Sequence, residues 1–319
     1  MSNFVIYSTK EDYYKVIYQD IIGKDYIRFI VSPVANRNLF LRFVYKVMMS
    51  PKLDFIFKRF RFFLNPLYDI DFGNDERNVY LFFYGRLPWV ENRILDYLKK
   101  KHKNCLTVCY FQDLIAKKNV DIEKIKKQFD LVLDYDEEEA NRYKIIYAPT
   151  PFSYVSLESS SNSETDVYFV GKAKERLREI YEVFDLLTSN GFKCDFYITD
   201  VAEKDKINKH GLHYINKNLS YVDNLRKVNK AKIVLELMQV GAVGYTLRTW
   251  EAIAYNKVLL TNNISLNKTP LVNQYNILAF EKFDEAAIEK LKAYKKKIYT
   301  YQDEFSPTKL LKKIDEYGK

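Results

Sequence analysis

At 319 residues the chain is too long for one ordinary domain and suits two domains of roughly 150 residues each. Its three cysteines form no paired spacing, and with the three histidines they lack a zinc-ligand pattern, so we expect reduced thiols and no metal site. The net charge of +9 points to anionic partners, and no run of ~18 uncharged apolar residues is present to form a membrane-spanning helix.

Strands and helices are predicted to alternate along the first half of the chain. The predicted strands are residues 4–7, 26–31, 79–84, 105–111, 131–134 and 145–148. The predicted helices are residues 13–22, 38–49, 90–100, 120–128 and 137–143, and residues 53–64 repeat the aromatic and basic character of 38–49. The runs at 79–84 and 105–111 are continuously apolar, which is typical of strands buried on both faces.

A second alternation follows a serine-rich stretch, residues 156–165, which is interpreted as the linker. Its predicted strands are residues 167–170, 194–198, 213–215, 231–236 and 258–261. Its predicted helices are residues 174–190, 222–229, 246–255, 284–294 and 308–317, and Gly191 is expected in a left-handed cap after the first of them.

This pattern predicts an α/β chain with two Rossmann-like, doubly wound domains that face a cleft. The expected parts are an N-terminal domain (1–155), the linker (156–165), a C-terminal domain (166–300) and a C-terminal helix region (301–319) that packs back toward the N-terminal domain. Open parallel sheets bind ligands at the carboxyl ends of their strands, so we expect the site there.

The stretch 231–263 carries the strongest chemical signal. A buried strand precedes a glycine-bearing loop and then a helix whose start holds Thr246, Arg248 and Glu251. A helix N-terminus with close backbone and a guanidinium suits a diphosphate, and a carboxylate one turn on can accept from ribose hydroxyls. With Gly244 and Tyr245 these residues form the predicted donor-binding group. Taken singly, Arg248 could be a surface ion-pair partner and Glu251 an ordinary N-terminal helix acid.

A second group lies at the first turn of the C-terminal domain, where Gly171, Lys172 and Lys174 follow a predicted strand. Cations at this edge would neutralise donor phosphates and a departing diphosphate. The alternative is a solvated, charged helix start, because the full phosphate-loop pattern is absent.

The segments GYTLRTWEAIAYNKVLLTNN (244–263) and FVGKAKERL (169–177) resemble bacterial lipopolysaccharide and capsule biosynthesis glycosyltransferases of the GT-B type, as does 129–149. The resemblance implies a cytoplasmic enzyme that moves a sugar from a nucleotide diphosphate donor to a surface glycan, without metal or cofactor. The chain departs from the family at Val243, where many retaining members carry a glutamate, so inverting and retaining transfer both stay open.

The acceptor side is expected in the N-terminal domain. Tyr84, Gly85 and Arg86 end one predicted strand and could line the acceptor pocket. Asp113 follows the next strand and is the candidate general base of an inverting transfer, or otherwise a turn aspartate. Two formal Asp-x-Asp patterns are interpreted as a turn (Asp69, Asp71) and a helix cap (Asp136) rather than a metal site.

Residues 37–63 hold seven cations and a single acid, Asp54, interleaved with phenylalanines. Such a segment could dock on an anionic membrane at its inner face, where a lipid-linked oligosaccharide acceptor would lie, or it could pack its aromatics inward. No leader segment is visible. The competing functions are a nucleotide-sugar 2-epimerase of the same architecture and a non-enzymatic nucleic-acid or membrane-binding protein, although no nucleic-acid partner is expected.

Overall fold

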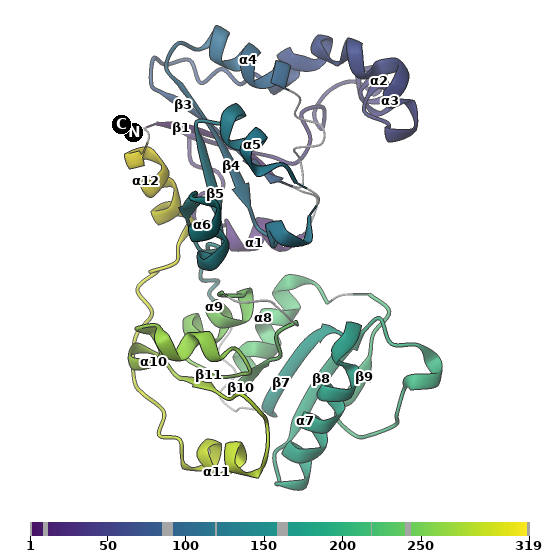
Figure 1. Cartoon of the computed structure of the whole chain (residues 1–319), viewed down its shortest axis with the longest axis vertical. Coiled ribbons are helices and arrows are strands. Elements are labelled where there is room, and N and C mark those ends of the chain that lie inside the picture. The colour runs from purple at the N-terminus through teal and green to yellow at the C-terminus, as the bar shows by residue number, and fades with distance from the viewer. Residues whose placement is uncertain are drawn as a thin grey trace. The chain divides into compact units, whose positions relative to one another are not determined.

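The computed structural model describes residues 2–8, 12–84, 92–118, 120–157, 165–217, 219–239 and 244–317. The chain divides into two compact units, and each is described by itself (Figure 1). The first comprises Met1–Pro149 with Pro307–Lys319, and the second comprises Thr150–Ser306. Most of the expected linker, residues 158–164, lies outside the described residues, and the stretch before it belongs to the second unit.

The first unit is built on a six-stranded, fully parallel sheet in the order β2-β1-β3-β4-β5-β6. Its strands are β1 (Asn3–Tyr7), β2 (Ile27–Ile30), β3 (Asn78–Phe83), β4 (Cys105–Phe111), β5 (Leu131–Asp134) and β6 (Ile146–Tyr147). Every residue of β3 is buried, as its unbroken apolar run predicts.

Helices cover both faces of this sheet. They are α1 (Asp12–Ile17), α4 (Asn92–Lys101), α5 (Ile122–Gln128), α6 (Glu137–Tyr143) and α12 (Pro307–Tyr317). Leu95 and Leu98 of α4 pack with Tyr80 and Phe82 on one face, whereas Tyr14 of α1 meets Phe83 on the other. The C-terminal helix packs back onto this unit, as predicted, because Asp315 pairs with Arg77 just before β3.

The segment between β2 and β3 departs from the expected pair of helices. It contains α2 (Leu39–Met48), two short turns at Pro51–Leu53 and α3 (Asp54–Phe57), and an irregular 3-10 run, η2 (Lys58–Tyr68). Pro66 and the dense aromatic residues disfavour a regular α-helix here. Tyr45 of α2 bonds Tyr68 of η2 at 2.8 Å, and Arg61 donates to the carbonyl of Met48 at 2.9 Å, so the inner sides of α2 and η2 are tied together.

The second unit also holds a six-stranded parallel sheet, in the order β12-β11-β10-β7-β8-β9. Its strands are β7 (Thr165–Lys172), β8 (Cys194–Thr199), β9 (Leu212–Tyr214), β10 (Ala231–Glu236), β11 (Val258–Thr261) and β12 (Ile277–Ala279). Counted within this unit, the order reads 3-2-1-4-5-6, which is the Rossmann order.

Two helical layers enclose this second sheet. Its helices are α7 (Leu177–Ser189), α8 (Tyr221–Lys230), α9 (Leu247–Ala254), α10 (Leu271–Gln274) and α11 (Glu285–Ala293). Phe184 of α7 and Ile288 of α11 pack on the face that carries Phe169 and Phe196. Tyr168 points to the other face, where it donates to Asn224 of α8. Gly191 adopts φ +85° after α7, which confirms the predicted left-handed cap.

Two short elements of the second unit escaped the sequence analysis, the strand β12 and the helix α10. Each spans fewer than five residues, too few for a periodic signal. All three cysteines are free, and Cys109 and Cys194 are buried. No helix among the described residues has both the length and the apolar character needed to cross a bilayer.

Candidate functional site

The strand order of the second unit locates one point of special interest. The order reverses between β7, the first strand of the unit, and β10, the fourth, so the helices that follow these two strands leave in opposite directions along the sheet. Such a switch point opens a crevice at the carboxyl ends of the two strands, which is where open α/β sheets bind ligands. The predicted donor-binding residues end β7 or follow β7 and β10, and they therefore belong to this edge.

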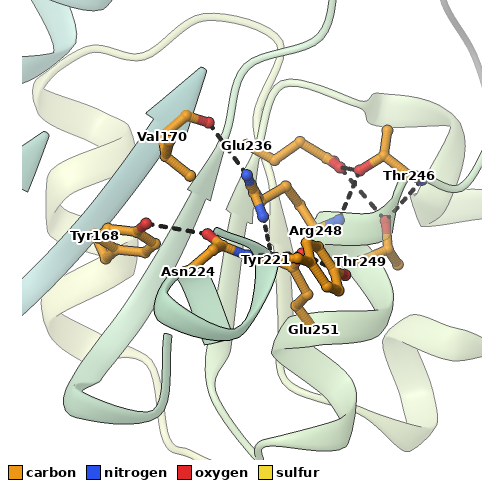
Figure 2. A network of polar contacts seen from close by, with 9 residues as sticks. All are labelled: Tyr168, Val170, Tyr221, Asn224, Glu236, Thr246, Arg248, Thr249 and Glu251. Atoms are coloured by element: carbon orange, nitrogen blue, oxygen red, sulfur yellow. Dashed lines mark hydrogen bonds and ion pairs between the residues drawn. The ribbon is translucent and has the colours of Figure 1, made fainter. Parts of the chain in front are cut away.

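The start of α9 is fixed by a buried carboxylate at the end of β10. Glu236 accepts a hydrogen bond from the hydroxyl of Thr246 (Figure 2). It also accepts from the hydroxyl of Thr261 at 2.6 Å. Thr246 is the N-cap of α9 and accepts from the backbone N–H of Arg248 at 3.0 Å. Thr249 completes a capping box with Thr246. One glutamate thus joins β10, β11 and the first turn of α9.

Arg248 projects from that first turn toward the end of β7. Its guanidinium forms an ion pair with Glu251 and donates to the carbonyl of Val170 at 3.4 Å (Figure 2). Its side chain stays 23% exposed, whereas Glu251 is fully buried. Both predicted residues therefore come together, and Arg248 keeps an accessible part at the switch point.

Glu251 has a different setting from the one expected of a ribose acceptor. One carboxylate oxygen accepts from Tyr221 at 2.8 Å and from Asn224 at 3.1 Å, and the other accepts from Arg248. Asn224 in turn accepts from Tyr168 at 3.0 Å. Because Glu251 is fully buried and both of its oxygens accept protein hydrogen bonds, it holds Arg248 in place.

Electrostatics in this network favour a charged guanidinium. Burial alone would lower the pKa of Arg248, but Glu251, Tyr168 and Tyr221 outweigh it and raise the pKa above its usual value. Burial raises the pKa of the Glu236 carboxyl, against the opposing effect of its hydroxyl donors and Arg248. A permanent cation at the ends of β7 and β10 is the result.

A second arginine crosses the same switch point. Arg176 donates to the carbonyl of Leu237 after β10, and to that of Lys172 at 3.2 Å. Burial lowers the pKa of Arg176, the Glu179 carboxylate opposes that effect, and the Arg248 charge adds to it, so the pKa stays below its usual value. An anion bound near both guanidinium groups would be stabilised by each of them. A Cβ at Gly171 would lie 3.1 Å from the Arg176 guanidinium, so glycine keeps the approach open.

The two predicted lysines of this edge lie at its solvent side. Lys172 pairs with Asp200 at 3.2 Å, with both side chains more than half exposed. Lys174 adopts a left-handed φ of +42° and donates to Gln239 at 3.0 Å. Their present partners are exposed and weakly held, so both ammonium groups can turn to an incoming anion.

The glycine loop is described from Gly244 onward. Gly244 has φ +88°, and Asn263 donates to its carbonyl at 2.8 Å. Tyr245 packs its ring against Trp250, with centroids 4.9 Å apart. Residues 240–243, which include the departure at Val243, lie outside the described residues.

On the first unit, the acceptor-side prediction is only partly covered. Tyr84 follows β3 and stacks on Phe111 of the neighbouring β4 at 4.5 Å. Asp113 lies just beyond β4, 77% exposed and paired with Lys118 at 3.0 Å. The predicted partners Gly85 and Arg86 lie outside the described residues. Tyr84 and Asp113 therefore lie at the carboxyl ends of adjacent strands.

The formal Asp-x-Asp patterns have structural partners. Asp69 pairs with Lys101 and His102, and Asp71 accepts from Gly73 in a turn. Asp136 caps α6, which confirms the predicted cap. Asp134, at the end of β5, is fully buried, and one of its oxygens has no partner among the described residues. Burial raises the pKa of Asp134 to about 7.

Sequence reasoning missed several members of the second unit's network. Glu236 ends a predicted strand and could have been noticed as an acid inside an apolar run. Tyr221 and Asn224 lie on α8, 30 and 27 residues before Glu251, and only the sheet order brings them to it. No local pattern marks them.

Solved structures are similar to this chain over most of its length. A trehalose-6-phosphate synthase is similar over 92% of both chains, with a TM-score of 0.56 and 12% identity. A UDP-forming α,α-trehalose-phosphate synthase from Burkholderia xenovorans is similar over 92% of both chains, with a TM-score of 0.52 and 10% identity. The chain therefore has the two-domain, Rossmann-like GT-B fold, and the likeness at this identity reaches no further than the fold. No protein-family model matches the chain, and no curated protein sequence does either.

Proposed function

We propose that the chain is a glycosyltransferase that moves a sugar from a nucleotide diphosphate donor to a cell-surface glycan. The second unit would bind the donor and the first unit the acceptor. One observation carries this proposal: two arginines, Arg176 and Arg248, bond carbonyls at the ends of the two strands that form the switch point of a Rossmann-ordered sheet, beside a capped helix start. Diphosphates match such a site in charge and in geometry.

In the proposed reaction an acceptor hydroxyl attacks the anomeric carbon as the bond to the donor diphosphate breaks. The electron pair of that bond leaves with the diphosphate, whose charge Arg248 and Arg176 would stabilise together with Lys172 and Lys174. Transfer without a metal ion is part of the proposal, because these four cations can supply the neutralisation that a divalent ion gives elsewhere. Glu251 would act as a positioning residue for Arg248.

The acceptor side of the proposal rests on the edge formed by β3 and β4. Asp113 is the candidate base that would take the proton of the acceptor hydroxyl in an inverting transfer. It is well exposed, and its partner Lys118 is held by one surface ion pair that an acceptor can displace. Tyr84, stacked on Phe111, offers a flat ring of the kind that sugars bind.

The proposed acceptor is a lipopolysaccharide or capsule glycan, carried on a lipid at the inner face of the membrane. The support is the resemblance of 244–263 to enzymes of that pathway, together with the basic aromatic segment of the first unit. The acceptor is assigned more specifically than the transferase activity, so the acceptor assignment can be wrong while the activity is right.

The test is a panel of nucleotide sugars, with UDP sugars first because one similar protein is UDP-forming. Release of nucleoside diphosphate, slowly to water and faster with a glycan acceptor, is the expected result. Epimerised nucleotide sugar without release would indicate the 2-epimerase instead. Absence of binding to every nucleotide sugar would overturn the proposal.

Two variants connect the activity to the switch point. Arg248→Ala should abolish donor turnover. Arg248→Lys keeps a charge for Glu251 but loses the two-pronged grip, so it should fold normally and lower turnover at least about tenfold. Arg226→Lys is the matched control, since Arg226 lies on the exposed side of α8 and pairs only with Asp223 among the described residues. Normal kinetics in folded Arg248→Lys and Arg248→Ala would refute the role of this site.

A further inference from the structure

The exposed side chains of residues 37–63, named here the basic aromatic surface, are unlike the rest of the described chain. All six exposed phenylalanines of that chain lie within it. Its large apolar members are exposed by 41–82%: Leu39, Phe40, Phe43, Phe55, Ile56, Phe60, Phe62 and Phe63. Aromatic side chains offer roughly 150–250 Å² each, so several hundred Å² of apolar area meets solvent, the extent that marks an interaction surface.

Helix α2 shows that this exposure belongs to the fold and is not a frayed end. Its inner side is tied down through Tyr45, and a side-chain cap from Asn38 to the N–H of Leu41 at 2.8 Å orders its start. Yet none of its residues is buried. Leu39, Phe40 and Phe43 stand on the outer side, where a surface helix normally carries polar residues.

Most cations of the same segment are exposed and lack counter-ions among the described residues. Arg61 is buried and pairs with Asp54 at 2.6 Å, which removes the only acid of the segment. The remaining cations are exposed and form no ion pair with any residue that the structure describes: Arg37, Arg42, Lys46, Lys52, Lys58 and Arg59. The surface therefore presents an excess of six positive charges around its phenylalanines.

We propose that the basic aromatic surface docks on an anionic phospholipid bilayer, with its phenylalanines in the interfacial region and its cations on the lipid phosphates. The docking extends the proposed function, and its link to a lipid-carried acceptor rests on that function. A bilayer satisfies both halves of the surface at once, because its interface takes rings and its headgroups take cations. A second copy of the chain fits poorly, since two such surfaces would bring six unpaired cations each into contact. Aliphatic Leu39 and Ile56 do not stack on bases, which disfavours nucleic acid.

Vesicle sedimentation tests the docking directly. The full chain should bind vesicles of phosphatidylcholine and phosphatidylglycerol in equal parts, and bind pure phosphatidylcholine at least about tenfold more weakly. Arg42→Gln with Lys46→Gln should weaken binding roughly fivefold per cation, and so about 25-fold in total. Phe40→Ser with Phe43→Ser should weaken it at least about tenfold even at full charge.

Matched controls lie on the second unit. Ile298 is 99% exposed, so Ile298→Ser removes an apolar side chain from another surface. Lys204→Gln with Lys282→Gln removes two exposed cations there. Both controls should bind anionic vesicles like the unaltered chain, whereas weakening equal to that of the surface variants would overturn the proposal.

Insertion has its own signature. Phe43→Trp places an indole on the basic aromatic surface, and its emission should shift to shorter wavelength with anionic vesicles and be quenched by brominated lipid chains. Ile298→Trp should show neither change. Binding that is equal for neutral and anionic vesicles, or a Phe43→Trp emission that stays unchanged, would overturn the docking. So would tighter binding to single-stranded DNA than to vesicles at the same salt, or a dimer that the phenylalanine variants abolish.

The outcome is separable from that of the proposed function. Nucleoside diphosphate release from a soluble donor should survive the vesicle-binding variants, and vesicle binding should survive Arg248→Lys. Turnover without vesicle binding would refute the docking alone, and vesicle binding without turnover would refute the transferase alone.

Discussion

The network around Arg248 and the basic aromatic surface use the same kinds of side chain in opposite ways. At Arg248, cation, carboxylate and hydroxyl groups satisfy one another inside the second unit (Figure 2). On residues 37–63, six phenylalanines are exposed, and six exposed cations form no ion pair with any described residue. The first arrangement is internally complete apart from the open side of Arg248. The cations and rings of the second arrangement would find their partners only on a surface outside the protein.

The contrast separates the two roles that a cation can have. A buried, paired guanidinium is held in one geometry, which suits the positioning of a reacting diphosphate. Each unpaired surface cation adds a small electrostatic attraction, and several together bind a fluid anionic surface. Substitutions in the network should therefore cost stability and activity, and those on the surface should cost neither.

The largest effect is expected where the buried ion pair is broken. Glu251→Gln leaves Arg248 without its carboxylate in a mostly buried position, so the free energy of unfolding should fall by about 3 kcal/mol. Chemical denaturation at pH 7 measures this. Arg248→Met should cost a similar amount, because it leaves the carboxylate of Glu251 unpaired.

The double variant Arg248→Met with Glu251→Gln is the control that isolates the pair. Neither charge is then left alone. The double variant should therefore lose about 1–3 kcal/mol less free energy of unfolding than the two single variants lose together. Additive losses would mean that the two side chains do not interact, and the comparison between paired and unpaired cations would fail.

The main layers of the fold were predictable because they depend on short-range patterns. The apolar run of β3 and the Rossmann-like alternation in both halves predicted two parallel sheets, and these are confirmed. Residues 53–64 were predicted to repeat the helical character of 38–49, but beyond the short α3 they belong to the 3-10 run Lys58–Tyr68. Their aromatic spacing resembles amphipathic periodicity, while Pro66 and crowded rings disfavour a regular α-helix.

The site was predictable only at its centre. Thr246, Arg248 and Glu251 share one helix start, so sequence spacing brings them together. The partners that decide the state of Glu251, Tyr221 and Asn224, come from another helix and depend on the sheet order. The exposure of the phenylalanines in 37–63 was also beyond sequence, because the same pattern serves an inward or an outward aromatic face.

An intermediate effect is expected from a buried carboxyl that has no cation beside it. Asp134 is buried among the acids Asp136 and Glu139, and its pKa is raised to about 7 from an unfolded value near 3.8. Between these two values the folded chain holds a proton that the unfolded chain has released. The free energy of unfolding therefore falls as pH rises through this window, and the loss is complete above about pH 7.

Asp134→Asn removes this dependence and keeps an oxygen that can accept the N–H of Asp136, now bonded at 2.9 Å. The variant should be more stable than the unaltered chain at pH 8, by on the order of 2 kcal/mol, and should lose that advantage at pH 4. Thermal unfolding across this pH range measures the difference. An advantage that is constant with pH would contradict a proton held by Asp134.

The smallest effect on stability is expected from removing an exposed ring of the basic aromatic surface. Phe43→Ser removes a ring that is 66% exposed, so the free energy of unfolding should change by no more than about 0.5 kcal/mol. Phe82→Ser, in the fully buried strand β3, is the matched change and should cost at least about 3 kcal/mol. A Phe43→Ser stability near that of the unaltered chain would mean that the ring does not stabilise the fold. Contact with an external surface would then explain its outward position. A large loss would mean that Phe43 packs inside the first unit and that the basic aromatic surface is part of its core.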